Sequence, residues 1–219
     1  MKIIEKFPNV YELDGWLATK SICVGTRVYG ERIVREGKDE YRTWDLHRSK
    51  LAAAIKKGLK EFPIAPSSKV LYLGAASGTT ASHISDILTK GELYCVEFAQ
   101  RSMRDLIAVC EARPNMVPIF ADARTPSQYS KDIGECDVLY QDVAQPDQSK
   151  ILLSNANACL KYGGFAMLCI KSQSIDVTKD PKIVYEKVIA DLEPCFEVLQ
   201  KIDLHPYDED HLFLHLRKK

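Results

Sequence analysis

The sequence has no net charge, because its 30 Lys and Arg residues are matched by 30 Asp and Glu residues. A chain without a strong basic excess lacks the field that allows a protein to hold nucleic acid unaided. The charges are unevenly distributed, however: residues 1–69 carry 14 basic and nine acidic side chains, whereas residues 70–219 carry 16 and 21. We therefore expect any anionic partner to approach the N-terminal third of the chain.

Long apolar runs and closely spaced cysteine pairs are also missing. No apolar run approaches the length that spans a membrane, and the first residues, 1–6, lack a secretory apolar stretch. The seven cysteines are odd in number, widely spaced and mostly set in apolar runs, as Cys95 and Cys169 are. This pattern predicts buried thiols in a reducing compartment, no metal site, no membrane attachment and a cytoplasmic location.

The apolar pattern changes along the chain. In residues 1–48, short alternating runs separated by Gly-containing turns predict a small antiparallel β-hairpin domain. These runs are residues 10–13, 32–35 and 41–44. Residues 49–62 then place apolar side chains on one helical stripe, with Ser49 as the predicted N-cap.

From Lys69 onward, an apolar strand, a turn and a helix repeat. The expected strands are 70–73, 93–96, 117–120, 138–140, 165–170, 196–204 and 211–216, and the expected helices are 80–88, 100–112, 148–160 and 183–192. Only a short turn separates the last two strands, so the C-terminal strand should run antiparallel. Residues 49–219 thus predict an α/β fold: a Rossmann-like, mainly parallel seven-stranded sheet with an antiparallel C-terminal strand.

Ligands of such sheets bind at the carboxyl ends of the strands, where three features stand out. Residues 74–80 form a turn of small residues before a helix, without the glycine spacing of a dinucleotide or triphosphate loop. Glu97 follows the second strand, where an acidic residue meets ribose hydroxyls, and Asp122 follows the third, where a carboxylate suits an adenine amino group.

Each feature is ordinary alone, since the turn could be a tight connection, Glu97 a surface acid and Asp122 a helix cap. Together they indicate an adenosine-containing ligand without a phosphate chain, a description that S-adenosylmethionine meets.

Five segments spread over the chain form a more specific combination than any generic methyltransferase turn. They are residues 71–80, 96–98, 121–124, 141–146 and 206–211. In these segments the chain resembles the fibrillarin family, and specifically its archaeal fibrillarin-like members. The Gly- and Arg-rich N-terminal tail of the eukaryotic members is absent, so the chain is similar to the short archaeal form.

The resemblance implies a class I S-adenosylmethionine-dependent methyltransferase. It would methylate ribose 2′-hydroxyls of pre-rRNA, with tRNA as an open alternative, as the catalytic subunit of a box C/D guide RNA ribonucleoprotein. The implied partners are the guide RNA, the target RNA, a Nop-type scaffold protein and, indirectly through these, a kink-turn-binding ribosomal protein. The implied cofactor contacts are Gly74, Ala75, Thr79, Thr80, Glu97, Phe98, Asp122, Ala123, Asp142, Val143, Ala144 and Gln145.

The resemblance also implies a catalytic set of Lys50, Asp142, Lys171 and His211. A ribose 2′-hydroxyl is a poor nucleophile at neutral pH, so the enzyme must position it in line with the methyl donor and help remove its proton. Our hypothesis makes Lys171 the base, because desolvation and the ammonium of Lys50 would favour its neutral form. Asp142 would orient Lys171, and His211 would tune the charge of the set.

Simpler roles stay open for two members of this set. Lys50 could be an exposed cation of a helix turn, and His211 a structural histidine. The family usually has an Asn-Pro pair between the Trp and the Arg-Ser-Lys, whereas this chain has Asp45-Leu46-His47. Without that proline, the backbone before Lys50 is freer.

Other functions also stay open. A stand-alone RNA ribose methyltransferase would act without a guide, and a non-catalytic structural subunit of the same particle would bind the cofactor without transferring its methyl group. A small-molecule methyltransferase is disfavoured, because nothing in the hairpins resembles a lid over a buried substrate.

Overall fold

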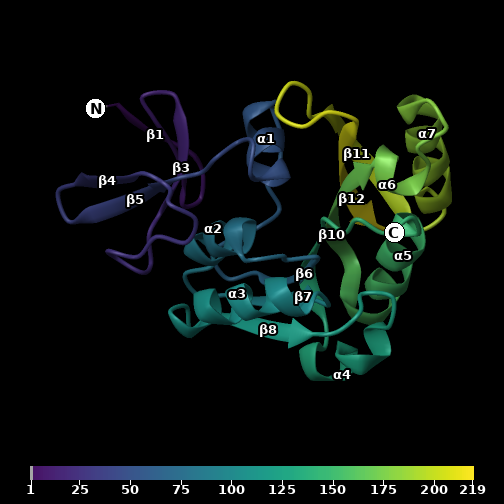
Figure 1. The fold of residues 1–219 in the computed structure, drawn as a ribbon, viewed down its shortest axis with the longest axis horizontal. Coiled ribbons are helices and arrows are strands. Elements are labelled where there is room, and N and C mark those ends of the chain that lie inside the picture. Colours follow the sequence, from purple (N-terminus) through teal and green to yellow (C-terminus); the bar gives the residue numbers. More distant parts are fainter. Residues whose placement is uncertain (1) are drawn as a thin grey trace.

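The computed structural model describes residues 2–219, which form two sheets joined by a short helix (Figure 1). The first sheet is antiparallel throughout, with strand order β1-β2-β3-β5-β4. Its strands are β1 (Ile3–Phe7), β2 (Val10–Leu13), β3 (Trp16–Lys20), β4 (Ile33–Glu36) and β5 (Asp39–Thr43). The predicted N-terminal hairpins are therefore confirmed, with bounds shifted by one or two residues.

The connecting helix α1 (Lys50–Lys56) begins as predicted but ends early. The hydroxyl of Ser49 caps it by accepting a hydrogen bond of 3.3 Å from the amide of Ala52. The prediction that the helix continues to residue 62 is wrong. Gly58 has a φ of +95°, and its amide turns back to a carbonyl of the last helical turn, a common way for helices to end.

The second sheet has the strand order β11-β12-β10-β9-β6-β7-β8. Its strands are β6 (Lys69–Leu73), β7 (Glu92–Glu97), β8 (Met116–Phe120), β9 (Cys136–Gln141), β10 (Leu160–Lys171), β11 (Phe196–Asp203) and β12 (His211–Lys218). Strands β6 to β10 pair in parallel, and β12 runs antiparallel to both of its neighbours. The predicted Rossmann-like sheet with an antiparallel C-terminal strand is confirmed.

Helices pack on both faces of the second sheet. The long ones are α2 (Thr79–Ile87), α3 (Gln100–Glu111), α5 (Gln148–Cys159) and α7 (Pro181–Leu192), all of which the sequence predicts. One core cluster includes Leu51, Ile84 and Leu106 of α1 to α3, and the other includes Ile151 and Val188 of α5 and α7. The sequence misses η1 (Pro126–Gln128), α4 (Ser130–Ile133) and α6 (Ser172–Ile175), which are too short to show a helical period.

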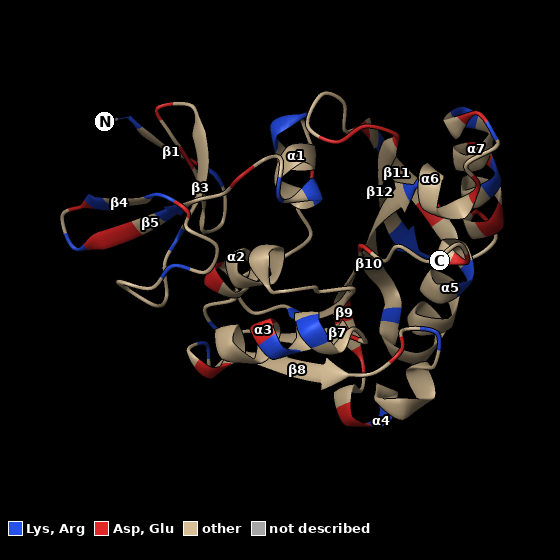
Figure 2. Ribbon diagram, in the orientation of Figure 1, with Lys and Arg blue, Asp and Glu red and all other residues tan. Residues whose placement is uncertain are grey.

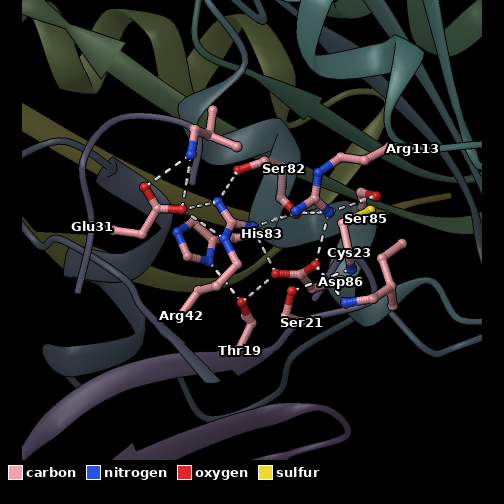
Figure 3. A network of polar contacts seen from close by, with 12 residues as sticks. Thr19, Ser21, Cys23, Glu31, Arg42, Ser82, His83, Ser85, Asp86 and Arg113 are labelled. Atoms are coloured by element: carbon pink, nitrogen blue, oxygen red, sulfur yellow. Dashed lines mark hydrogen bonds and ion pairs between the residues drawn. The ribbon is translucent and has the colours of Figure 1, made fainter. Parts of the chain in front are cut away.

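A buried ion-pair network joins the first sheet to α2 (Figure 3). Arg42 of β5 lies 2.6 Å from Glu31 and 2.8 Å from Asp86, and Arg113 lies 2.7 Å from the other oxygen of Asp86. All four side chains are at most 1% exposed. Burial opposes ionisation of Glu31, but the amide of Tyr29 and the guanidinium of Arg42 outweigh it and lower the pKa of Glu31. Two anions and two cations therefore lock the sheet to the helix.

His83 extends this network as a neutral side chain. Its ring stacks on Trp44 with centroids 4.8 Å apart, and its two nitrogens lie 2.7 Å from the hydroxyls of Thr19 and Tyr29. The hydroxyl of Thr19 donates its proton to Asp86 at 2.7 Å, because a carboxylate can only accept. The Thr19 oxygen therefore accepts the hydrogen bond from His83, whose Nδ1 carries the ring proton. Burial and the two guanidiniums of the network hold the pKa of His83 well below its ordinary value.

Five of the seven cysteines are buried, but Cys23 is half-buried and Cys195 is exposed. The prediction of a buried thiol is therefore wrong for Cys195. This residue lies directly before β11, and the next side chain, that of Phe196, is the one that enters the core. Within residues 2–219, no helix combines the length and apolar character needed to cross a membrane.

Candidate active site

A cavity of about 220 Å³ lies at the carboxyl edge of the second sheet, where β6, β7, β8 and β9 end. Eight of the predicted cofactor contacts line it: Gly74, Glu97, Phe98, Ala123, Asp142, Val143, Ala144 and Gln145. Lys171 lines it as well. Three further residues line the cavity that were not predicted as cofactor contacts: Ala76, Val96 and Ala121. Each lies within two residues of a predicted contact.

Backbone geometry holds the carboxylates at this edge. Glu97 is 7% exposed, and its two oxygens accept hydrogen bonds from the amides of Ala76 at 2.9 Å and Ala99 at 2.8 Å. Gly74 has a φ of +80°, and a Cβ at this position would lie 3.0 Å from the carbonyl oxygen of Asp142. Only glycine combines this conformation with so close an approach, so Gly74 allows Asp142 to sit directly beside the turn.

Four predicted cofactor contacts do not line the cavity: Ala75, Thr79, Thr80 and Asp122. Thr80 is buried, and its hydroxyl donates to the hydroxyl of Ser49 at 2.9 Å, which ties α2 to the start of α1. Asp122 accepts from the amide of Arg124 at 2.9 Å and caps no helix, because the next helical element begins at Pro126 with Thr125 as its N-cap. A ligand contact by these four residues stays a prediction.

The four predicted catalytic residues lie in one chain of ion pairs. Lys171 Nζ is 2.8 Å from Asp142 Oδ1 and donates to the Asp142 carbonyl oxygen at 2.8 Å. Lys50 Nζ lies 3.5 Å from Asp142 Oδ1 and 3.2 Å from Asp208 Oδ2. His211 Nδ1 lies 2.9 Å from Asp208 Oδ1. Asp208 therefore connects His211 to Lys50, and Lys50 connects both of them to Asp142 and Lys171.

The sequence reasoning assigned no role to Asp208. Burial opposes its ionisation, but a hydrogen bond from His211 and the charge of Lys50 outweigh burial and lower its pKa. The signal was present, because Asp208 lies within one of the segments that carry the resemblance. Because Asp208, Glu209 and Asp210 are three consecutive acids, the sequence alone does not show which of them contacts the catalytic set.

Lys50 is held as a cation. Burial would lower its pKa, but the carboxylates of Asp142 and Asp208 outweigh burial and raise the pKa above the usual lysine value. Figure 2 shows basic residues in blue on α1, whose first and last residues are Lys50 and Lys56. Lys50 shares the carboxylate of Asp142 with Lys171.

The missing proline before Lys50 has a local replacement. The side chain of Asp45 accepts a hydrogen bond of 2.8 Å from the amide of His47, which fixes a turn two residues long. Ser49 then caps α1 and receives the hydroxyl of Thr80. These contacts restrict the backbone that leads to Lys50.

Lys171 is positioned by a buried glutamine. The amide of Lys171 donates to Gln148 Oε1 at 3.1 Å, and the side-chain amide of Gln148 donates to the Lys171 carbonyl at 3.4 Å. The next residue, Ser172, donates from its hydroxyl to the carbonyl of Asp210 at 3.0 Å. The end of β10 and the turn before β12 are thereby held together, which keeps Lys171 and His211 at one edge.

The cavity fits an adenosine-containing ligand in its chemistry. Gln145 lines it and has a buried side-chain oxygen without a hydrogen-bond partner in the described part of the chain. Each oxygen of Glu97 accepts one amide and can accept another donor, such as a ribose hydroxyl. Phe98 and Val143 give the wall an apolar surface on which an adenine ring can pack.

Comparisons with known proteins agree on one family. The family model described as Fibrillarin matches residues 1–219. The chain is 50% identical over 219 residues to the fibrillarin-like rRNA/tRNA 2′-O-methyltransferase of Pyrococcus furiosus, which covers 97% of this chain and 96% of the relative.

Solved structures give the same similarity. Aeropyrum pernix fibrillarin in complex with natively bound S-adenosyl-L-methionine has a TM-score of 0.89 and 45% identity, and covers 99% of both chains. A fibrillarin solved in complex with Nop5p has a TM-score of 0.92 and 40% identity, and covers 99% of this chain and 100% of that one.

Proposed function

The chain belongs to the fibrillarin family, and we propose that it is an S-adenosylmethionine-dependent RNA ribose 2′-O-methyltransferase that acts on pre-rRNA and tRNA. The observation that carries this proposal is the ion-pair chain at the cavity rim, in which Lys171 lies 2.8 Å from Asp142 and both line the cavity. The name of the Pyrococcus furiosus relative and the cofactor bound to the Aeropyrum pernix structure support it.

Bound in the cavity, S-adenosylmethionine would supply an electrophilic methyl group on a sulfonium. Glu97 and Gln145 would hold it through oxygens that can accept hydrogen bonds. Lys171 Nζ would take the proton of the ribose 2′-hydroxyl, whose oxygen gains the methyl group while the cofactor sulfur keeps the electron pair of the broken carbon–sulfur bond and leaves as a thioether. The resulting ammonium is stabilised by the side-chain and main-chain oxygens of Asp142, both 2.8 Å away.

The ion pairs of the set support this role for Lys171. The cluster has two carboxylates, Asp142 and Asp208, and three basic groups, Lys50, Lys171 and His211. Both carboxylates raise the pKa of Lys50, which keeps this side chain a cation. Because Lys50 shares Asp142 with Lys171, the Asp142 carboxylate has a cationic partner besides Lys171.

The zero net charge of the chain supports partners that hold the RNA while this chain carries out the methyl transfer. A fibrillarin 40% identical to this chain has been solved with Nop5p, which supports a Nop-type scaffold as partner here. We include a box C/D guide RNA and a kink-turn-binding ribosomal protein in the proposal, because a neutral subunit needs others to hold and select the target. The five buried thiols support a reducing, cytoplasmic location.

Methyl transfer from labelled S-adenosylmethionine tests the proposal. The substrate is an RNA complementary to a box C/D guide, and the chain alone is compared with the reconstituted particle. We expect label only with the particle, at one 2′-hydroxyl specified by the guide. Equal transfer by the chain alone would establish the stand-alone enzyme instead, and cofactor binding without transfer in either sample would establish a structural subunit.

A further inference from the structure

Both tryptophans of the chain, Trp16 and Trp44, line a second cavity of about 510 Å³. Its walls come from Gly15 and the first two residues of β3 and from two further segments, residues 29–32 and 43–48. None of these residues belongs to the set of predicted cofactor contacts or to the ion-pair chain. The cavity therefore needs its own explanation.

The walls combine flat rings with cations. Trp16 is 63% exposed, and the guanidinium of Arg48 lies 5.8 Å from the ring centroid of Tyr29. Arg32 and His47 are exposed lining residues as well. Exposed aromatic rings beside guanidiniums are the surfaces on which unpaired bases stack and phosphates bind.

The lining acids leave one cation of the wall unopposed. Glu31 is 5% exposed and lies 2.6 Å from Arg42, which balances it in the buried network. The carboxylate of Asp45 accepts the amide of His47 at 2.8 Å and lies 3.9 Å from Arg48, which it offsets. Arg32 remains as the lining arginine without an ion pair in the described residues.

A buried donor on the wall lacks an acceptor. Trp44 is 2% exposed, and its indole Nε1–H is buried without a hydrogen-bond partner in the described residues. Such unpartnered donors are rare in native folds and are usually satisfied by a bound water or ligand. A base or a phosphate oxygen supplies one.

One stretch of backbone joins the wall of this cavity to the ion-pair chain. Its wall residues 44–48 run directly into Ser49 and Lys50. The ring of His47 also packs edge-on against Tyr207, 5.5 Å between centroids, and Tyr207 adjoins Asp208. A strand whose ribose lies at Lys171 and Lys50 can therefore continue into this cavity.

We propose that this cavity binds an unstacked nucleotide of the target RNA strand that flanks the methylated ribose. Its base stacks on Trp16 and Tyr29, and Arg32 and Arg48 hold the adjoining phosphates. The inference rests on the proposed function, since it places the strand by the reacting 2′-hydroxyl. The excess of basic residues in the first 69 favours RNA over a protein segment as the occupant.

Single-turnover transfer in the reconstituted particle, at rising concentrations of target RNA, tests the proposal. Trp16→Ala should raise the RNA concentration for half-maximal rate by about tenfold, the loss of one base stack, and by more than it lowers the rate at saturation. Tyr162→Ala is the matched control, because Tyr162 is an 83% exposed aromatic residue outside both cavities. If both variants respond alike, the proposal is overturned.

Tryptophan emission gives a direct reading of the same cavity, since both tryptophans line it. An unstructured ten-nucleotide RNA with the target sequence should quench the emission of the full chain saturably. Arg32→Ala should weaken this quenching, whereas Arg35→Ala, a charge change at an exposed arginine outside the cavity, should not. Emission that responds to the scaffold protein and not to RNA would overturn the proposal in favour of a protein-docking surface.

The two proposals fail in different ways. If the wild-type particle transfers no methyl group, the proposed function fails whatever the emission shows. If the wild type transfers and Trp16→Ala matches it at every RNA concentration, only the nucleotide site fails.

Discussion

Two clusters of paired charges in this chain use similar residues in opposite ways. In the network between the first sheet and α2, the ion-paired side chains of Arg42, Glu31, Asp86 and Arg113 are at most 1% exposed. In the ion-pair chain at the cavity, the side chains of Lys50, Asp142, Lys171, Asp208 and His211 are 14–28% exposed. The cations of the buried cluster are arginines, and those of the open cluster are lysines and a histidine.

The choice of cation explains this difference. An arginine remains protonated at any physiological pH and offers five donors, so it suits a buried site whose charges must stay paired. Lysine and histidine can lose a proton, which a catalytic set requires. Access to water and substrate is the second requirement, and only the open cluster meets it. A buried network fixes geometry, whereas a half-buried one can do chemistry.

Removing the base should produce the largest effect. We expect Lys171→Ala to reduce single-turnover transfer by about 10³-fold, within the range for loss of a general base. Binding of S-adenosylmethionine, followed by calorimetry, should change little. Lys161→Ala is the matched control, because Lys161 lies in the same strand, β10, and pairs with Asp137 of β9 away from the cavity. Wild-type turnover by Lys171→Ala would show that another group takes the proton.

Breaking the buried network should lower the free energy of unfolding and should not act directly on methyl transfer. Asp86→Ala leaves two buried guanidiniums without their shared carboxylate, and we expect the free energy of unfolding in urea to fall by about 3–5 kcal/mol. Asp137→Ala removes a carboxylate that is 36% exposed, so its loss should be below about 1 kcal/mol. Similar losses in the two variants would contradict the role assigned to burial.

Asp208 should behave as a positioning residue of intermediate effect. Asp208→Asn keeps the shape but removes the charge between Lys50 and His211, and we expect the maximal rate of transfer to fall about tenfold. The pH profile of the rate should also change, because the charge of Asp208 helps to hold the pKa of Lys50 above its ordinary value. Glu209→Gln, which neutralises the adjacent exposed acid, is the control. An unchanged pH profile would reduce Asp208 to a structural residue.

The sequence predicts the second sheet well, because each buried parallel strand is a short apolar run bounded by turns. It places Asp142 and Lys171 at the sheet edge for the same reason, since both directly follow such runs. The helix predicted from the sequence is longer than α1, because Leu59 is buried beyond the end of the helix and extends the apolar pattern with helical spacing. Gly58, two residues beyond Lys56, is the sequence signal that indicates the earlier end of the helix.

The buried network leaves no local trace in the sequence. Arg42 and Asp86 are 44 residues apart, and Arg113 lies 27 residues beyond Asp86. Each is an ordinary charged residue among its neighbours, and only the packing of the first sheet on α2 brings them together. The link through Asp208 is hidden in the same way, since it joins a turn near the C-terminus to the first residue of α1.

The smallest effect we expect is a dependence of stability on pH that originates at the buried network. The pKa of His83 lies well below 6.5 in the folded chain and near 6.5 when unfolded, so the unfolded state binds more protons as the pH falls below about 6.5. Stability is therefore complete above that pH and declines below it, by about 1.4 kcal/mol between pH 7.5 and 5.5 for one such histidine. His215, whose pKa burial also lowers, adds to the decline, whereas the lowered pKa values of Glu31 and Asp208 act only at more acidic pH. Urea unfolding at both pH values should show a smaller decline for His83→Gln than for the wild type, and an equal decline would mean that His83 is not held neutral.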